Sequence, residues 1–179
     1  AELDLNGASD KLILDADGDT TISADTDDQI DFKAGGTDIM SLTATTATFN
    51  DGVTISVADN SDNLTLTSTD ADGSVGPNLR LYRNSSSPAD NDDLATIDFE
   101  GRNDNSQDVQ YGMIRAILKD ASDGTEDGLL EFHHMKNGTL APSLQVGPDE
   151  VVINESSNDY DFRVETNGNA NMFVVDGGN

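Results

Sequence analysis

Short segments with alternating apolar and polar residues, separated by turns rich in Asp and Gly, constrain the fold of this chain most. The pattern is clearest at 53–57, where Val53, Ile55 and Val57 alternate with Thr and Ser, and it recurs at 11–14, 27–33, 63–67 and 95–100. Alternation of this kind places the apolar side chains on one side of an extended strand. Asp and Gly are suited to the tight turns between strands. The sequence therefore predicts an all-β chain.

The segment 111–119 is the one place where a helix and a strand compete. Ile114, Ile117 and Leu118 fit one face of a helix, but only nine residues separate Gln110 from Asp120, which is short for a helix and normal for a strand. We therefore predict a strand, with Ile114, Ala116 and Leu118 on one side. The acidic stretch Asp120–Gly128 that follows is interpreted as a hairpin loop leading to a second strand at 129–134.

A loose internal repeat suggests how the strands are organised. A small polar residue, Asp, one further residue and an apolar-x-apolar strand occur at 9–14, 27–32 and 61–66, with looser copies at 92–97 and 157–162. This pattern favours stacked β-units over a closed barrel. We expect a β-repeat segment at 1–75, a β-hairpin-rich globular segment at 76–150, and a C-terminal β-hairpin at 151–179. Because the chain starts at Ala1 and not Met, we expect a piece of something longer.

Composition narrows the classes of partner. Only 35% of the residues are hydrophobic and the formal net charge is −26, a combination typical of disorder. The ordered spacing of the apolar residues argues for folding, and association of identical chains would bury what one copy cannot. The charge repels nucleic acid and anionic membranes and favours salt and divalent cations. There is no Cys, and no apolar run is long enough to cross a bilayer.

One turn has the composition of a cation site. Asp15, Asp17 and Asp19 alternate with Ala16 and Gly18, as oxygen ligands do in calcium-binding loops. The twelfth position of such a loop falls on Thr26, where a bidentate Glu is expected, so a solvated β-turn is the alternative interpretation. The sequence 70–74 and the set Asp123, Glu126 and Asp127 are weaker versions. No other cofactor is expected.

Catalytic chemistry has little support in the sequence. Strand alternation puts Glu131 and His133 on one face and His134 on the other, which leaves too few ligands for a zinc site. Nucleophilic motifs such as Gly-x-Ser-x-Gly do not occur. The 35 acidic residues leave a carboxylate pair for glycoside hydrolysis open, but nothing in the sequence selects one. We therefore expect no enzyme and no catalytic residue.

Several segments in the middle of the chain resemble a known family. Ile97-Asp-Phe-Glu-Gly-Arg102, Tyr111-Gly-Met-Ile-Arg-Ala-Ile117 and Asp120-Ala-Ser-Asp-Gly-Thr-Glu-Asp-Gly-Leu-Leu-Glu-Phe132 resemble a region common in tail fibre and tail spike proteins of bacteriophages. Gly138-Thr-Leu140 and Leu144-Gln-Val-Gly-Pro-Asp149 continue this likeness. The segments at 12–20 and 162–172 are similar in style to repeats in the fibres of aquatic phages.

The resemblance implies an elongated, intertwined homotrimer that forms a shaft segment of a virion tail fibre. Its function would be structural, in host attachment, with other fibre or tail proteins as neighbours and any host glycan bound through another region. The alternative is an extracellular surface filament or adhesin of a salt-adapted microbe, stiffened by calcium. A polysaccharide-degrading spike is a third class.

Overall fold

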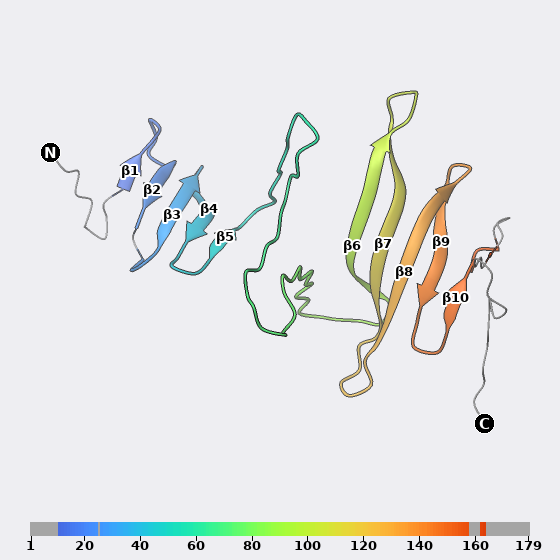
Figure 1. The fold of residues 1–179 in the computed structure, drawn as a ribbon. Coiled ribbons are helices and arrows are strands. Elements are labelled where there is room, and N and C mark those ends of the chain that lie inside the picture. Colours follow the sequence, from blue (N-terminus) through green and yellow to red (C-terminus); the bar gives the residue numbers. More distant parts are fainter. Residues whose placement is uncertain (1–10, 25, 158–161, 164–179) are drawn as a thin grey trace. The chain divides into compact units, whose positions relative to one another are not determined.

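The chain forms two compact units, residues 1–77 and 78–179, each built on one antiparallel sheet (Figure 1). This computed structural model describes residues 11–24, 26–157 and 162–163. Within those ranges every regular element is a strand and there is no helix. The prediction of an all-β chain is therefore confirmed for the described residues.

The sheet of the first unit has five strands in sequence order, each paired with the next. They are β1 (Lys11–Ile13), β2 (Thr21–Ser23), β3 (Ile30–Ala34), β4 (Thr37–Leu42) and β5 (Ala47–Phe49). The β3–β4 hairpin turns on Gly35 and Gly36, whose φ angles are 56° and 77°. Two successive positive φ values give a hairpin turn whose twist matches that of the strands, and Gly adopts them without strain.

The sheet of the second unit also follows sequence order and has longer central strands. They are β6 (Asp92–Arg102), β7 (Asp108–Asp120), β8 (Asp127–Lys136), β9 (Thr139–Val146) and β10 (Val151–Ile153). Asn137 and Gly138 form the β8–β9 turn with φ angles of 50° and 79°. Asn and Gly suit this tight turn, because both tolerate positive φ.

The register of the first sheet sorts its side chains into rows. Residues paired across antiparallel strands point to the same side of the sheet. One row crosses all five strands with apolar side chains: Leu12, Ile22, Phe32, Met40 and Phe49. The neighbouring row is polar and points the other way: Lys11, Ser23, Asp31, Ser41 and Thr48.

The second sheet repeats this arrangement on a larger scale. Its apolar face, as we call it, carries two rows, namely Ile97, Ile114, Phe132, Leu144 and Ile153, and beside them Ala95, Ala116, Leu130, Val146 and Val151. Its polar face carries the row Thr96, Arg115, Glu131, Gln145 and Val152. The strand predicted at 111–119 is confirmed, as is the side of the sheet predicted for Ile114 and Ala116.

In both sheets polar side chains are buried while many apolar side chains are exposed, which is the reverse of a complete hydrophobic core. Among the described residues, the only buried apolar ones are Ile117 and Ala141, whereas Thr21, Asp31 and Glu131 are 2–5% exposed. Side chains of the apolar rows are far more open: Phe49 is 52% exposed and Ile97 is 41% exposed. Stable sheets cover their apolar side with a second layer. Within each described unit, that layer is not supplied.

Two strands expected from alternation do not form. Residues 53–57 and 63–67 lie in a stretch without strand pairing that runs from β5 to β6, and Ile55 and Leu64 are 50% and 62% exposed. The prediction was wrong because alternation shows only that a segment has an apolar side and a polar side. It does not show that another backbone lies beside the segment to form hydrogen bonds with it. The C-terminal hairpin predicted at 151–179 lies largely outside the described residues, although its first strand, Val151–Ile153, does pair with β9.

Candidate functional site

The first candidate site is the turn between β1 and β2, where Asp15, Asp17 and Asp19 meet. One carboxylate oxygen from each of the three lies within 4.8 Å of the other two. Asp15 Oδ1 accepts hydrogen bonds from the backbone N–H of Gly18 at 3.1 Å and of Thr20 at 3.2 Å, which folds the turn back on itself. Gly18 has a φ of 80°, which suits glycine at this position. The turn thus gathers three carboxylates by its own local hydrogen bonds.

The pKa values of the two outer carboxylates of this turn are shifted in opposite directions. Hydrogen bonds from Thr20, and then from Asp19 and Gly18, lower the pKa of Asp15 from 3.8 to about 2. Desolvation, together with the hydrogen bond and the charge of Asp15, raises the pKa of Asp19 above its ordinary value. Neighbouring like charges disfavour ionisation of the second group. A bound cation would relieve that repulsion, so the geometry suits a hard divalent ion such as calcium.

The other acidic turns differ from this one. In the described part of the chain, three carboxylates come this close together only at Asp15, Asp17 and Asp19. The set predicted at Asp123, Glu126 and Asp127 does not converge in this way. At 70–74, the carboxylates of Asp70 and Asp72 accept hydrogen bonds from the backbone N–H two residues on, at 3.3 and 2.7 Å. That contact is ordinary turn chemistry.

The acidic stretch Asp120–Gly128 is the loop of the β7–β8 hairpin, as predicted. Asp120 pairs with Asp127 across its base. The Ser122 N–H donates to Asp120 Oδ1 at 2.8 Å, and this contact holds the pKa of Asp120 below its ordinary value. Gly124 has a φ of 85° at the tip. The loop is therefore closed by Asp and Gly turn chemistry.

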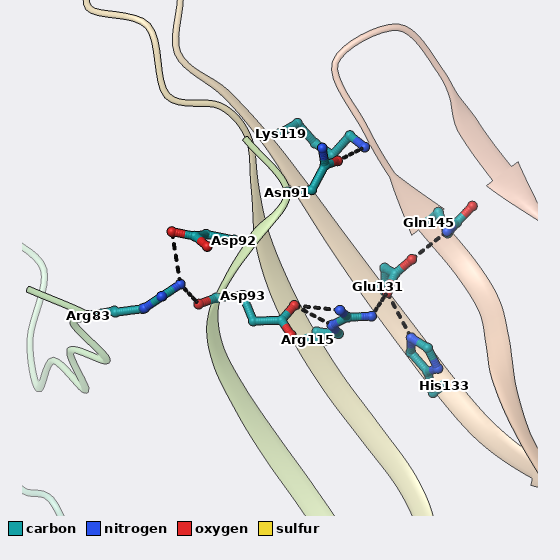
Figure 2. Close-up of polar contacts among 9 residues, drawn as sticks. All are labelled: Arg83, Asn91, Asp92, Asp93, Arg115, Lys119, Glu131, His133 and Gln145. Atoms are coloured by element: carbon teal, nitrogen blue, oxygen red, sulfur yellow. Dashed lines mark hydrogen bonds and ion pairs between the residues drawn. The ribbon is translucent and has the colours of Figure 1, made fainter. Parts of the chain in front are cut away.

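The second candidate site is a charged network on the polar face of the second sheet. Figure 2 shows its members contributed by four successive strands, β6 to β9. Arg115 Nε donates to Asp93 Oδ1 at 2.7 Å, and Arg115 lies 3.4 Å from Glu131 Oε2. Glu131 also bonds His133 Nε2 at 2.9 Å and accepts from Gln145 Nε2 at 2.5 Å. Glu131 is thus the acceptor at the centre of the network.

Glu131 remains a carboxylate although it is only 5% exposed. Burial raises its pKa, but the hydrogen bonds from His133 and Gln145 and the charges of His133 and Arg115 outweigh burial, so the pKa lies below the ordinary 4.5. Opposite charges and donors favour the ionised form. Each Glu131 oxygen has a partner within the network. The arrangement therefore suits cross-strand stabilisation better than proton transfer to a substrate.

Sequence reasoning placed Glu131 and His133 on one face and His134 on the other, and the register confirms it. His134 pairs with Gly112 and Ala141, in line with Phe99 on the apolar side. Arg115, Asp93 and Gln145 were missed as members of one cluster, because they come from three different strands. The register alone brings Arg115 opposite Glu131 and Glu131 opposite Gln145. A correct alignment of the hairpin at 120–128 would have found Arg115. Gln145 and Asp93 also require the register of β9 and of β6.

Three further contacts tie residues before β6 to the sheet (Figure 2). Arg83 lies 3.2 Å from Asp92 Oδ2 and donates to the carbonyl of Asp93 at 2.8 Å. Lys119 donates to Asn91 Oδ1 at 2.6 Å. These basic side chains pair with the chain's own acceptors, so they form part of the fold of the second unit.

Comparison with known protein families, curated proteins and solved structures found no match to this chain. The resemblance to phage tail fibre proteins therefore stays a prediction. In the ranges that the structure describes, no helix is long and apolar enough to cross a membrane.

Proposed function

We propose that this chain is a structural segment of a bacteriophage tail fibre, without catalytic activity, that works as a homotrimer in a virion appendage for host attachment. The observation that carries the proposal is the exposure of the apolar rows in both sheets while neighbouring polar residues are buried. A sheet of this kind is completed by another layer, and identical chains are the simplest source of one.

The bonding of the charged groups supports a structural role over an enzymatic one. A general base or nucleophile needs a free atom directed at a substrate. Glu131, in contrast, accepts from His133 and Gln145, and Arg115 lies between Glu131 and Asp93. These contacts join neighbouring strands and so suit a load-bearing sheet.

The unpaired alternating segments support assembly. Val53, Ile55, Val57, Leu64 and Leu66 are 41–62% exposed in a stretch without strand partners. In an intertwined trimer such segments would find both apolar and backbone partners on other copies. The net charge of −26 would keep the assembled surface soluble. Neighbouring fibre or tail proteins would be its other partners.

The test is the mass of the particle in solution together with its location. Light scattering on the purified chain should give three times the monomer mass of 18.9 kDa. Antibodies against the chain, visualised by gold labelling, should decorate tail appendages of virions. A stable monomer would overturn the self-association, and labelling of a cell surface in place of virions would overturn the phage assignment.

The alternative function is an extracellular surface filament or adhesin of a salt-adapted microbe. The convergence of Asp15, Asp17 and Asp19 favours it, because calcium would stiffen the first unit outside the cell. The same gold labelling separates the two proposals, since it decorates either virions or cells.

A further inference from the structure

We infer that the apolar face of the second sheet is the surface through which copies of this chain pack against one another. This inference rests on the self-association in the proposed function and deepens it by naming the contact surface. The polar face of the same sheet would then remain on the outside of the assembly.

The composition of the apolar face is the first argument. Its two rows hold ten side chains from five strands, and none of the ten is charged. The whole chain has 35 acidic residues among 179, about one in five, so an even spread would put about two acids on these rows. Leu130, Val146 and Ile153 on this face are 38–45% exposed. Apolar surface of this kind on a soluble protein indicates an interaction site.

The opposite face of the sheet needs no partner. Glu131 is 5% exposed and its oxygens are bonded within the network, while Ile117 on the same side is 7% exposed. The polar side of the sheet is therefore already satisfied by its own contacts, whereas the apolar side is still exposed to water. Only the apolar side gains from a covering layer.

The size of the face is that of an interaction patch. The five strands, spaced about 4.8 Å apart, make it about 24 Å wide, and its two rows extend about 13 Å along the strands. Contact with other copies would therefore remove on the order of 300 Å² per copy from water at this face, the size of the larger apolar patches that mark interaction sites.

The edges of the sheet argue against growth by strand addition. The edge strand β6 carries Asp92, Asp93, Asp98 and Glu100 and has two register irregularities. Charges and bulges on an edge strand block pairing with another chain. The other edge, β10, has three residues and offers little backbone to pair with. Association through the face is therefore favoured over association through an edge.

Charge explains why the covering layer is a second copy. An acidic partner would be repelled by the net charge of −26, and a basic partner would find no carboxylate in the two rows of this face. The carboxylate next to them on this side, that of Asp92 opposite Leu118, is already paired with Arg83. The apolar faces of the other copies in the homotrimer need neither attraction. Packing these uncharged surfaces together leaves the acidic surfaces in water.

The first experiment measures protection of a single thiol and needs no disruption of the assembly. The chain has no Cys, so Ile97→Cys and Thr96→Cys each introduce one thiol, on adjacent residues of β6 that point to opposite faces. In the native assembly, a maleimide should label the Ile97→Cys thiol about tenfold or more slowly than the Thr96→Cys thiol. Dilution that dissociates the assembly should abolish the difference.

The second experiment places a charge on the face. Leu130→Asp on β8 should reduce the particle mass measured by light scattering, because a carboxylate would be buried without a partner. Thr96→Asp adds the same charge on the polar face, opposite Arg115, and should leave the mass unchanged. Circular dichroism of both variants shows whether the strands persist.

The outcomes separate this inference from the function on which it rests. An oligomer with a protected Ile97→Cys thiol supports both. An oligomer in which that thiol labels as fast as the Thr96→Cys thiol overturns the face as the contact, but leaves the self-association intact. A monomer overturns both, and a monomer in which the Ile97→Cys thiol is protected shows that the chain covers its own face.

Discussion

The two sheets share one plan but are stabilised on their polar sides in different ways. Both are five-stranded meanders crossed by an apolar row. In the first, strands of three to six residues are joined by turns such as that of Asp15, and the polar row is made mainly of Ser, Thr and Asp. In the second, β6 to β9 have eight to thirteen residues and carry a network centred on Glu131. Short strands depend on their turns, and long ones gain from cross-strand pairs.

This difference is measurable because the two units carry different probes. Tyr82, Tyr111 and Tyr160 all lie in residues 78–179, and residues 1–77 contain no Tyr. Tyrosine fluorescence therefore reports on the second unit, while far-ultraviolet circular dichroism reports on strands in both. A substitution in one unit should move one signal more than the other.

The largest effect is expected from Glu131→Ala. It removes the acceptor shared by His133 and Gln145 and leaves Arg115 with Asp93 alone. Removing one member of a buried charged network leaves its donors unpaired, and the loss here should be about 2–3 kcal/mol because Arg115 and Asp93 are partly exposed. Urea unfolding followed by tyrosine fluorescence measures it.

Glu100→Ala is the matched control. Glu100 is an exposed acid on β6, and its loss should change the free energy of unfolding by less than about 0.5 kcal/mol. If the two variants lowered the free energy of unfolding equally, the Glu131 network would add no more stability than a surface charge. The two sheets would then not differ in how their polar sides are stabilised.

A smaller effect, confined to the first unit, is expected from Asp15→Ala. The substitution removes the acceptor for the Gly18 and Thr20 N–H groups and so loosens the β1–β2 turn. The dichroism transition should move to lower urea while the tyrosine transition stays in place. Asp17→Ala removes a neighbouring charge without removing those two bonds, and it should move neither transition to lower urea. A shift of the tyrosine signal by Asp15→Ala would contradict the independence of the two units.

Acid should separate the contributions of the two carboxylates. The pKa of Glu131 lies below its ordinary 4.5 in the folded chain, so its contribution to stability is complete above pH 4.5 and is lost as the pH falls through the folded pKa. For Asp15 the corresponding loss runs from pH 3.8 down to about 2. Both contributions therefore make the folded chain less stable in acid.

The difference in unfolding free energy between wild type and Glu131→Gln should shrink on acidification, measured by tyrosine fluorescence. His133, Gln145 and Arg115 face Glu131 and remain in both proteins. The subtraction therefore cancels the general effect of titrating other acids. A difference that stays constant from pH 6 down to pH 2 would show that the ionised form of Glu131 is not favoured by folding.

Much of this architecture was readable from the sequence because local patterns determine it. Alternation placed Ile114 and Ala116 on one side of their strand, and Asp and Gly marked the hairpin loop at 120–128. The Asp15 turn was also found, since its carboxylates are close in the chain. The Glu131 network was not, because it depends on the register between four strands, from Asp93 on β6 to Gln145 on β9.

The missing strands at 53–57 and 63–67 show the opposite limit. Their alternation is as regular as that of any strand that forms, and Val53 and Leu64 have the apolar spacing of a half-buried face. What they lack is a neighbouring strand to pair with, and the alternation within a segment does not specify one. Sequence patterns therefore identify which side of a segment is apolar, and pairing decides whether it becomes a strand.

The smallest effect on stability is expected from calcium. It would stabilise the first unit alone and so separate the two units further. Three carboxylates within 4.8 Å, one of them with a raised pKa, would bind a divalent ion and lose part of their mutual repulsion. Millimolar calcium should raise the melting temperature by dichroism, but not by tyrosine fluorescence. NaCl of matched ionic strength controls for screening of the net charge of −26. Asp17→Asn should abolish the calcium increment while the response to NaCl persists. If the variant and the wild type respond alike, the ion acts on the overall charge and the turn is an ordinary solvated one.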